Sequence, residues 1–335
     1  MESRFVEVQK HSGERLRRYL SEQKLLNRDV RPKAADATLQ IPIIREPDAA
    51  ELAEIKRIAG CKLHVGVGEF ENVQRRPAIE DLLGFSPSFE VIGDIAILIP
   101  PQEVTVREAA DAILAVNKAI KTVAIPKTPV SGDFRVRSFE CVAGIPLHEV
   151  CIKEHGNRFK FDIEKVYFSP RLATERQRVA SQIKRDEFVV DMFAGVGPYT
   201  IPVAKRAFKV YAIDINPDAV KYLKENLSLN HIENVEVREG DVREFTSDLV
   251  NIADRAIMNL PLQAFEFLDV ALSIVKSGGV IHFYDTRRDD DLFDGLTREL
   301  ESIAGEIEVL ERRIVRSYAP HLYTVVIDFV VKERF

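Results

Sequence analysis

The chain is poor in cysteine, and this shortage excludes two kinds of structural site. Its 335 residues include only three cysteines, Cys61, Cys141 and Cys151, which are scattered along the sequence. Three isolated thiols do not make a disulfide framework, and their spacing does not match that of metal ligands. We therefore predict no metal centre and expect a reducing, cytoplasmic compartment.

Long apolar runs are missing as well. No stretch approaches the roughly 20 apolar residues that cross a bilayer, and the N-terminus lacks a signal-peptide pattern. The apolar share of 46% is ordinary for a globular chain. A length of 335 residues suggests two or three domains. We expect a globular protein without a membrane partner.

The chain has no overall excess of positive charge, because its formal net charge is −6. Local excesses exist nevertheless. Residues 1–34 carry nine Lys/Arg against five Asp/Glu, and residues 133–178 carry nine against seven. A phosphate backbone requires such local basic surface rather than global basicity. The two clusters agree with a nucleic-acid partner, although a solvated charged surface explains each of them equally well.

The most informative stretch that is present lies between residues 188 and 216. An apolar run ends in Asp191, a turn with Gly195 and Gly197 follows, and a second apolar run ends in Asp214. This order is typical of a strand–turn–helix–strand unit that binds a nucleoside. Glycines let the backbone approach a ligand because no Cβ intervenes. Asp214 lies 19 residues beyond Gly195, where a carboxylate can accept hydrogen bonds from both ribose hydroxyls.

The turn favours S-adenosylmethionine (SAM) over a dinucleotide. The third glycine of the dinucleotide pattern is missing, since Thr200 stands at that position. Asp191 would repel a phosphate, whereas it could hold the ammonium group of SAM. The segment from Asp191 to Gly197 resembles the first motif of class I SAM-dependent methyltransferases. The alternative is a glycine turn that only tightens the corner between a strand and a helix.

This resemblance implies an α/β fold with a Rossmann-like, seven-stranded, mostly parallel sheet. The sequence predicts its further strands at residues 235–242, 255–262, 278–284, 307–317 and 323–331, the last two as a terminal hairpin. In the resembled class, the acid and apolar residue that end the third strand contact adenine; here they are Asp241 and Val242. Asn259 and Pro261 end the fourth strand, where ligands bind in open α/β sheets.

The front half of the chain predicts two smaller α+β units. Residues 1–70 alternate strand and helix patterns and form the first unit. Residues 71–88 are polar and punctuated by proline, which predicts a linker with a short helix at 79–83. Residues 89–162 form the second unit, and residues 163–335 form the methyltransferase domain.

Several segments together narrow the resemblance. They are Phe134–Arg137, Val166–Arg176, Asp191–Pro198, Ala212–Pro217, Met258–Pro261 and Ile314–Pro320. In combination they closely resemble the archaeal and eukaryotic tRNA guanine-N1 methyltransferases, which act at tRNA position 37, just 3′ of the anticodon. The likeness covers most of the chain. The block Ser-Pro-Arg-Leu-x-x-Glu-Arg at residues 169–176 is the part that distinguishes this family from other class I enzymes.

The chemistry of guanine N1 explains which residues such an enzyme needs. N1 carries a proton and is a poor nucleophile until a base removes that proton. Negative charge then builds on O6, where a guanidinium would stabilise it. By analogy with the family, Glu175 is the base and Arg135 is the O6 partner. Residue chemistry alone favours a plainer role for Glu175, as an ion-pair partner of Arg171 or Arg178 on a helix.

The resemblance implies three sets of site residues. The catalytic set is Glu175, Arg135 and Asn259. The cofactor-binding set is Tyr167, Arg171, Asp191, Phe193, Gly195, Gly197, Asp214, Ile215, Asp241, Val242 and Asn259. The substrate-binding set is Arg135, Arg137 and Pro261. Arg171 is the candidate for the SAM carboxylate, although a surface ion pair is the alternative. Phe193 is expected to cover the cofactor, although core packing would explain it nearly as well.

The expected partner is tRNA, held by its folded body on residues 1–70 and by its anticodon loop on the rest of the chain. The family is expected to act as monomers without a protein partner. Other substrates stay open: inosine, a wyosine precursor, another RNA base, or a protein or small molecule. A non-catalytic RNA-binding role is a further alternative. The sequence Asn-Leu-Pro-Leu at 259–262 lacks the aromatic residue typical of adenine-N6 enzymes, and all cysteines precede residue 152, which disfavours 5-methylcytosine chemistry.

Overall fold

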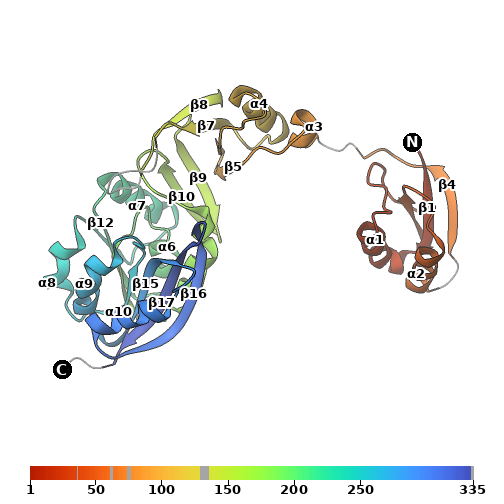
Figure 1. The fold of residues 1–335 in the computed structure, drawn as a ribbon. Helices are drawn as coiled ribbons and strands as arrows, with labels where there is room; N and C mark the ends of the chain where they lie inside the picture. Colours follow the sequence, from red (N-terminus) through yellow and green to blue (C-terminus); the bar gives the residue numbers. More distant parts are fainter. Residues whose placement is uncertain (36, 61–62, 74–76, 129–135, 333–335) are drawn as a thin grey trace. The chain divides into compact units, whose positions relative to one another are not determined.

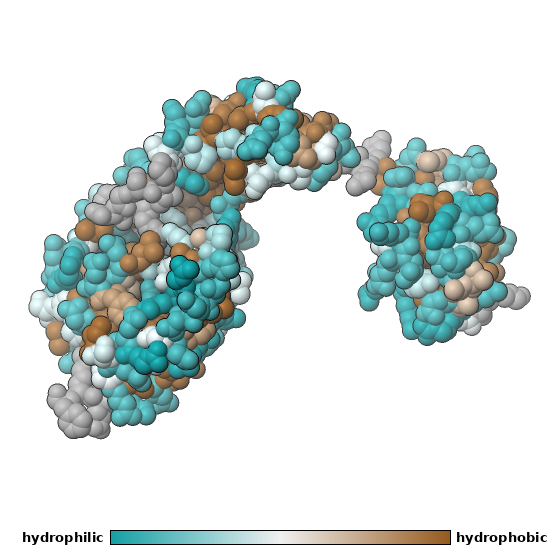
Figure 2. Space-filling model, viewed as in Figure 1, coloured by the Kyte–Doolittle hydropathy of each residue, from teal (hydrophilic) through white to brown (hydrophobic). Residues whose placement is uncertain are grey.

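The chain folds into two compact units, Met1–Ala78 and Ile79–Phe335 (Figure 1). The structure is a computed structural model, and it describes all residues except 36, 61–62, 74–76, 129–135 and 333–335. The boundary between the units falls within the linker that the sequence predicts over 71–88. Within the described residues, no helix is long and apolar enough to cross a membrane. Polar side chains dominate the face shown in Figure 2, and apolar ones gather over α3 and α4.

The first unit is a small antiparallel sheet with two helices. Its strands are β1 (Glu2–Gln9), β2 (Lys33–Ala34), β3 (Thr38–Ile43) and β4 (His64–Glu69), in the order β2-β3-β1-β4. Its helices are α1 (Gly13–Glu22) and α2 (Ala49–Ala59), preceded by the short turn η1 (Lys10–Ser12). Asp48 and Glu51 begin α2 with a reciprocal capping box. Val6, Leu20 and Ile55 belong to the core that joins both helices to the sheet.

The second unit begins with a four-stranded sheet. Its strands are β5 (Phe89–Ile92), β6 (Ile95–Leu98), β7 (Thr122–Pro126) and β8 (Phe139–Gly144), in sequence order. The helix α4 (Val106–Val116), capped by Thr105 and Glu108, makes the crossover between the parallel strands β6 and β7. The short helix α3 (Ile79–Leu83) lies at the predicted position and packs beside α4.

A hairpin connects this sheet to the rest of the unit. It consists of β9 (Glu149–Glu154) and β10 (Asn157–Asp162), and its two turn residues, His155 and Gly156, both have positive φ. Phe159 and Phe161 of β10 pack in one buried cluster with residues of β6 and of α7 (Pro217–Leu229). The Asn226 side chain pairs with the backbone of Lys160 in both directions. Because residues 89–162 share a core with the following domain, both lie in one compact unit.

The remaining residues form the seven-stranded, mostly parallel sheet that the resemblance implies. Its strands are β11 (Phe188–Asp191), β12 (Lys209–Asp214), β13 (Val235–Glu239), β14 (Ala253–Met258), β15 (Val275–Arg288), β16 (Ile307–Ala319) and β17 (Leu322–Val331). Their order is β13-β12-β11-β14-β15-β17-β16. The pairings among β11 to β15 are parallel, and β17 lies antiparallel between β15 and β16.

Helices cover both faces of this sheet. One face carries α8 (Thr246–Leu249), α9 (Leu268–Ile274) and α10 (Asp294–Ala304), and the other carries α5 (Ala173–Gln182), α6 (Thr200–Ala204) and α7. Short 3-10 turns precede three helices: η2 (Pro170–Leu172), η3 (Val242–Phe245) and η4 (Ala264–Phe267). The fold is therefore a three-layer α/β arrangement whose parallel strands all end at one edge.

Candidate active site

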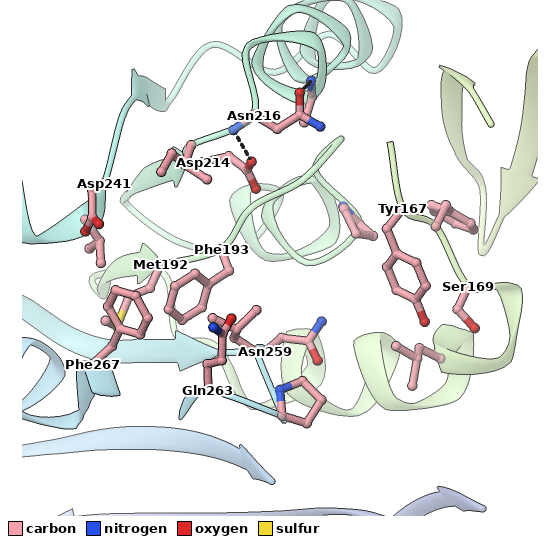
Figure 3. Close-up of a pocket in the computed structure, with 18 of the residues that line it drawn as sticks. Tyr167, Ser169, Met192, Phe193, Asp214, Asn216, Asp241, Asn259, Gln263 and Phe267 are labelled. Atoms are coloured by element: carbon pink, nitrogen blue, oxygen red, sulfur yellow. Dashed lines mark hydrogen bonds between the residues drawn. The ribbon is translucent and has the colours of Figure 1, made fainter. Parts of the chain in front are cut away.

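A pocket of about 350 Å³ lies at the carboxyl edge of the parallel strands (Figure 3). Ligand pockets in open α/β sheets occur at this edge, and sites for small organic molecules usually begin near 300 Å³. The lining residues follow directly on β11 to β14, and the segment 167–169 closes the opposite side. Eight of the predicted site residues line it: Tyr167, Phe193, Asp214, Ile215, Asp241, Val242, Asn259 and Pro261.

The glycine turn after β11 supports this pocket from behind. Gly195 has a φ of +54° and Gly197 has a φ of +91°, and residues other than glycine rarely adopt such backbone conformations. A Cβ at Gly197 would lie 2.6 Å from Leu223 Cδ1, so the close packing of α7 also requires glycine here. The amide of Gly195 donates a 2.6 Å hydrogen bond to Asp214 Oδ2. Neither glycine is among the lining residues.

The two acids of the nucleoside-binding unit have different positions. Asp214 lines the pocket and accepts backbone hydrogen bonds from Gly195 and, at 2.9 Å, from Asn216. Burial raises its pKa above the ordinary value. Asp191 lies deeper and is only 1% exposed; Thr200 Oγ1 donates to it at 2.7 Å. Burial, with a smaller contribution from the charge of Asp214, raises the pKa of Asp191 to about 7.

Aromatic and apolar side chains form the part of the pocket that the adenine ring is predicted to occupy. Phe193 packs edge-on against Phe267, with ring centroids 5.1 Å apart. Asp241 accepts hydrogen bonds from the backbone and side chain of Arg243, both at 2.9 Å, and the contact with Arg243 lowers its pKa. Val242 is 2% exposed. Sequence reasoning missed Phe267 and Arg243, since neither belongs to a recognised motif.

The terminal hairpin contributes two pocket residues that sequence reasoning also missed, Arg316 and Thr324. Arg316 Nη2 donates to Tyr167 Oη at 3.2 Å. The Oγ1 atom of Thr324 is buried and has no hydrogen-bond partner among the described residues. The likeness of residues 314–320 to the family was a signal for this region, but it assigned no role to Arg316.

Glu175, the predicted base, is not among the pocket-lining residues. Its side chain on α5 is 5% exposed. Arg178 binds both carboxylate oxygens through Nε, at 3.1 and 3.0 Å, and Tyr284 Oη donates to Oε1 at 2.7 Å. Leu172, three residues before Glu175, and Arg176, the next residue, do line the pocket. Glu175 therefore lies directly behind the pocket wall, and the plainer expectation of an ion pair with Arg178 is confirmed.

This ion pair belongs to a buried chain of charged groups beneath the sheet edge. Arg178 Nη1 also donates to Asp328 at 2.5 Å, and His282 Nδ1 lies 2.7 Å from the same carboxylate. Arg255 Nη1, always a donor, faces His282 Nε2 at 3.2 Å, so the ring proton must lie on Nδ1 and point to Asp328. Burial alone would raise the pKa of Asp328, but His282 and Arg178 hold it well below the ordinary range.

Two of the predicted arginines, Arg137 and Arg171, are not among the residues that line the cofactor pocket. Arg171, the candidate for the SAM carboxylate, instead pairs with Glu90 at 3.4 Å and lines a neighbouring cavity. The physical reason is that the η2 turn directs it toward the sheet of β5 to β8, where an acidic partner is available. Arg137 lines the same neighbouring cavity and lies over the ring of Phe139. Arg135 lies outside the described residues.

The pocket fits SAM on its own chemistry. A carboxylate at the end of β12 is placed for ribose hydroxyls, and an acid–apolar pair after β13 is placed for adenine. Figure 3 shows Asp214, Asp241 and Phe193 on one side of the pocket and Tyr167 and Ser169 on the other. Asn259 lies between these two sides.

Comparison with known families agrees with this arrangement. Residues 150–311 match the TRM5/TYW2 methyltransferase domain. Residues 6–51 match the tRNA methyltransferase 5 N-terminal domain, and residues 68–146 match the TYW2 N-terminal domain.

Curated relatives differ in how much of the chain they match. The tRNA (guanine(37)-N(1))-methyltransferase Trm5b of Pyrococcus abyssi is 39% identical, and the match covers 97% of this chain and 98% of that protein. The tRNA 4-demethylwyosine(37)-methyltransferase Taw21 of Saccharolobus solfataricus is 36% identical, but that match covers only 71% of this chain and 92% of the relative.

Solved structures show the same likeness. The structure described as the complex of aTrm5 and tRNALeu is similar with a TM-score of 0.71 and 36% identity, over 98% of this chain and 99% of that one. The M. jannaschii TYW2 structure in complex with AdoMet is similar with a TM-score of 0.57 and 30% identity, over 73% of this chain and 100% of that one. Since a relative 39% identical matches nearly its whole length, the chain belongs to the archaeal and eukaryotic-type tRNA (guanine-N1)-methyltransferase family of class I, SAM-dependent enzymes.

Proposed function

We propose that this protein methylates N1 of guanosine at position 37 of tRNA with SAM as the methyl donor. The observation that carries this proposal is the extent of the match. Two archaeal relatives named for guanine-37 N1 methylation match 97–98% of the chain, whereas the archaeal relative named for 4-demethylwyosine methylation matches 71%. The full-length match includes the Met1–Ala78 unit, part of which fits the tRNA methyltransferase 5 N-terminal domain.

Glu175 is our candidate for the base. When bound, SAM supplies a methyl carbon on a positively charged sulfur, and the carbon–sulfur bond breaks with its electron pair on sulfur as guanine N1 takes the carbon. Glu175 accepts the N1 proton, which frees the N1 electron pair for this attack. For this step its carboxylate must be released from Arg178 and Tyr284, because these two residues bind both of its oxygens.

Asn259 and Pro261 are the candidates for holding the target base. Both line the pocket just after β14. The side-chain amide of Asn259 can donate and accept, which suits the mixed edge of guanine. We propose that Arg135 stabilises O6, a role that rests on the family resemblance because this residue lies outside the described residues. Arg137 is a further candidate for substrate contact.

We also propose how the chain divides this work. Residues 1–70 would hold the folded tRNA body, and residues 89–335 would hold the anticodon loop and carry out methyl transfer. Position 37 lies in a stacked loop, so its base must turn out to enter the pocket. We propose a monomer without a protein partner, because the described residues of one chain complete the pocket. A cytoplasmic location is a proposal that rests on the three scattered cysteines.

The test uses the full chain, SAM and an unmodified tRNA transcript. Mass spectrometry of the digested product should show 1-methylguanosine at position 37, and a transcript with adenosine 37 should not be methylated there. Glu175→Gln should lower turnover by roughly 100- to 10,000-fold without changing SAM affinity. The control is Glu311→Gln. Glu311 is another acidic partner of Arg178, its side chain is 37% exposed, and the variant should keep near-normal turnover. Methylation at another nucleoside would overturn the assignment, and full activity of Glu175→Gln would overturn the role of this residue.

A second candidate is methylation of a tricyclic wyosine precursor at the same position. The Taw21 relative, named for this activity, is 36% identical to this chain. Incubation with tRNA that carries 4-demethylwyosine distinguishes the two. A methylated tricyclic product formed as fast as 1-methylguanosine would establish a second activity.

A further inference from the structure

A second cavity, of about 170 Å³, adjoins the cofactor pocket within the same unit. The two share Tyr167, Phe168, Ser169 and Arg316, so that Arg316 and the segment 167–169 form the partition between them. The second cavity is further lined by Glu90 and Phe139 from the sheet of β5 to β8 and by Arg137 and Arg171. It therefore lies between the cofactor pocket and the sheet of β5 to β8.

Arg316 has no acidic partner among the described residues. It donates only to neutral oxygens, Tyr167 Oη at 3.2 Å and Ser169 Oγ at 3.4 Å. Its Nε is buried without a hydrogen-bond partner in the described part of the chain. The other two arginines of the cofactor pocket are different, because Arg176 pairs with Glu154 and Arg243 pairs with Asp241. A partly buried guanidinium without an anion is costly, which indicates that the anion comes with a ligand.

Two more guanidinium groups face the same cavity. Arg137 stacks on Phe139 at 5.0 Å and makes no ion pair within the described residues. Arg171 has one acidic partner, Glu90, at 3.4 Å, and its side chain is 65% exposed. Glu90 is the one acid that lines this cavity in the described part of the chain. Three positive charges against one negative charge leave a balance of +2, which favours an oxyanion; the fork of arginine suits two of its oxygens.

We propose that Arg316, Arg137 and Arg171 form an oxyanion site whose occupant is a backbone phosphodiester next to the target nucleotide. This inference rests on the proposed function, because a nucleoside turned into the pocket brings its flanking phosphates to the pocket mouth. The carboxylate of SAM is the other source of an oxyanion. The phosphodiester fits better because Arg137 and Arg171 line the second cavity and not the cofactor pocket, where three acids, Asp214, Asp241 and Glu266, balance the three lining arginines.

The first experiment compares the full chain with Arg316→Gln, Arg316→Lys and Arg137→Gln. The matched control is Arg312→Gln, which lies on the same strand β16, is 43% exposed and lines neither cavity. Affinity for unmodified tRNA is measured by filter binding over a range of salt concentrations. We expect Arg316→Gln to weaken binding roughly 10- to 100-fold, the range for a lost charged hydrogen-bond pair. The slope of log K against log salt should fall by about 0.7–0.9.

Arg316→Lys and Arg137→Gln keep the test valid if Arg316→Gln fails to fold. Arg316→Lys retains the charge and should keep the salt slope while losing affinity. Arg137→Gln should lower both the affinity and the slope. Arg312→Gln should change neither. Equal tRNA affinity and salt slope in all four variants and the parent would overturn the proposal.

The second experiment identifies the source of the oxyanion. SAM and 5′-methylthioadenosine, which lacks the amino-acid carboxylate, are titrated into the parent and Arg316→Gln by calorimetry. We expect no difference for either compound. A loss of affinity for SAM alone would assign Arg316 to the cofactor carboxylate and overturn the phosphodiester site. In a third measurement, one phosphate beside position 37 of the tRNA is replaced by a neutral methylphosphonate. This tRNA should bind the parent more weakly than unmodified tRNA does, whereas Arg316→Gln should bind both tRNAs equally.

The outcome does not depend on the role of Glu175. Glu175→Gln should lose turnover but keep the tRNA affinity and salt slope of the parent. If the parent methylates a nucleoside other than guanosine 37, the proposed function fails, whereas the phosphonate scan still locates the phosphate that Arg316 contacts. If guanosine 37 is methylated and no phosphonate position couples to Arg316, this inference alone fails.

Discussion

The two sides of the candidate active site are built in different ways. The cofactor side consists of residues that immediately follow β11 to β14, such as Asp214 and Asp241. Next to the opposite side, outside the pocket lining, buried charges join α5 to the ladder of β15, β16 and β17. On the cofactor side, the hydrogen bonds of Asp214 to Asn216 and of Asp241 to Arg243 span two residues. On the other side, Arg178 reaches Asp328 across 150 residues.

This difference indicates that the two groups of charged residues have different roles, one in ligand binding and one in stability. The cofactor side presents short, local contacts and keeps carboxylates available to a ligand. The opposite side satisfies its carboxylates with arginine, histidine and tyrosine, which fixes Glu175 behind the wall. Substitutions on the first side should therefore change ligand affinity, whereas substitutions on the second should change stability.

The largest effect is expected from Asp328→Asn. Asp328 is 1% exposed and accepts from both Arg178 and His282, so that an amide leaves the buried arginine without its charge partner. The free energy of unfolding should fall by about 3–5 kcal/mol, measured by urea denaturation. Glu311 is a 37% exposed partner of the same arginine. Glu311→Gln should therefore change the free energy of unfolding by less than about 1 kcal/mol. Equal effects of the two substitutions would remove the contrast between the sides.

Asp214→Asn sharpens the comparison from the cofactor side. The variant keeps one acceptor oxygen but loses the charge and one of the two ribose contacts. SAM affinity measured by calorimetry should fall by roughly 10- to 100-fold, with little change in stability. Asp218→Asn, which alters a carboxylate at the start of α7 outside the pocket, should bind SAM normally. Unchanged affinity of Asp214→Asn would show that ribose is not held there.

The glycine turn allows a matched pair of substitutions on one loop. In Gly197→Ala, the new Cβ would lie 2.6 Å from Leu223 Cδ1, on a residue whose φ is +91°. This substitution should lower the free energy of unfolding by about 1–3 kcal/mol. Alanine at Gly195 has open space, since the nearest atom is Pro198 Cδ at 4.0 Å, and should cost about 1 kcal/mol for its φ of +54°. Urea denaturation measures both, and the reverse order would contradict the packing argument.

The smallest effect concerns the pH dependence contributed by Asp191. Its pKa is raised to about 7 in the folded protein, so between about pH 4 and pH 7 the folded state holds a proton that the unfolded state has released. Stability should therefore fall as pH rises through this range and level off above it. Between pH 6 and pH 8 the parent should lose about 1 kcal/mol more than Asp191→Asn. Parallel stability profiles of the parent and this variant would show that Asp191 is ionised throughout.

Much of the fold was predictable because its signals are local. Apolar runs that end in acids or in asparagine gave the strands β11 to β14, and the terminal hairpin followed from two apolar runs around a turn. The same runs gave Asp214, Val242 and Asn259 as pocket residues, since the carboxyl ends of parallel strands share one edge. Phe267 and Thr324 were missed, because nothing in their own neighbourhood indicates that η4 and β17 reach the pocket.

Charged residues on the opposite side were predicted less well for a physical reason. Helical spacing allows Arg171 to pair with Glu175. Only the packing of β5 to β8 against η2 decides that Arg171 pairs with Glu90 instead. Helical spacing allowed Glu175 to pair with Arg171 or Arg178, and the structure shows Arg178. Long side chains choose among partners by tertiary position, which residue spacing alone does not specify.

The sequence by itself determined the class I fold, the nucleoside-binding unit and the family, since strand-ending residues and glycine turns act through backbone geometry within a few positions. Only the tertiary structure decided which carboxylates line the pocket and which are buried outside it. Because β17 lies between β15 and β16, Asp328 on β17 reaches Arg178 of α5. Strand β16 is then the edge strand, and Arg316 on this strand contacts Tyr167. Such contacts depend on strand order, which joins residues more than a hundred positions apart.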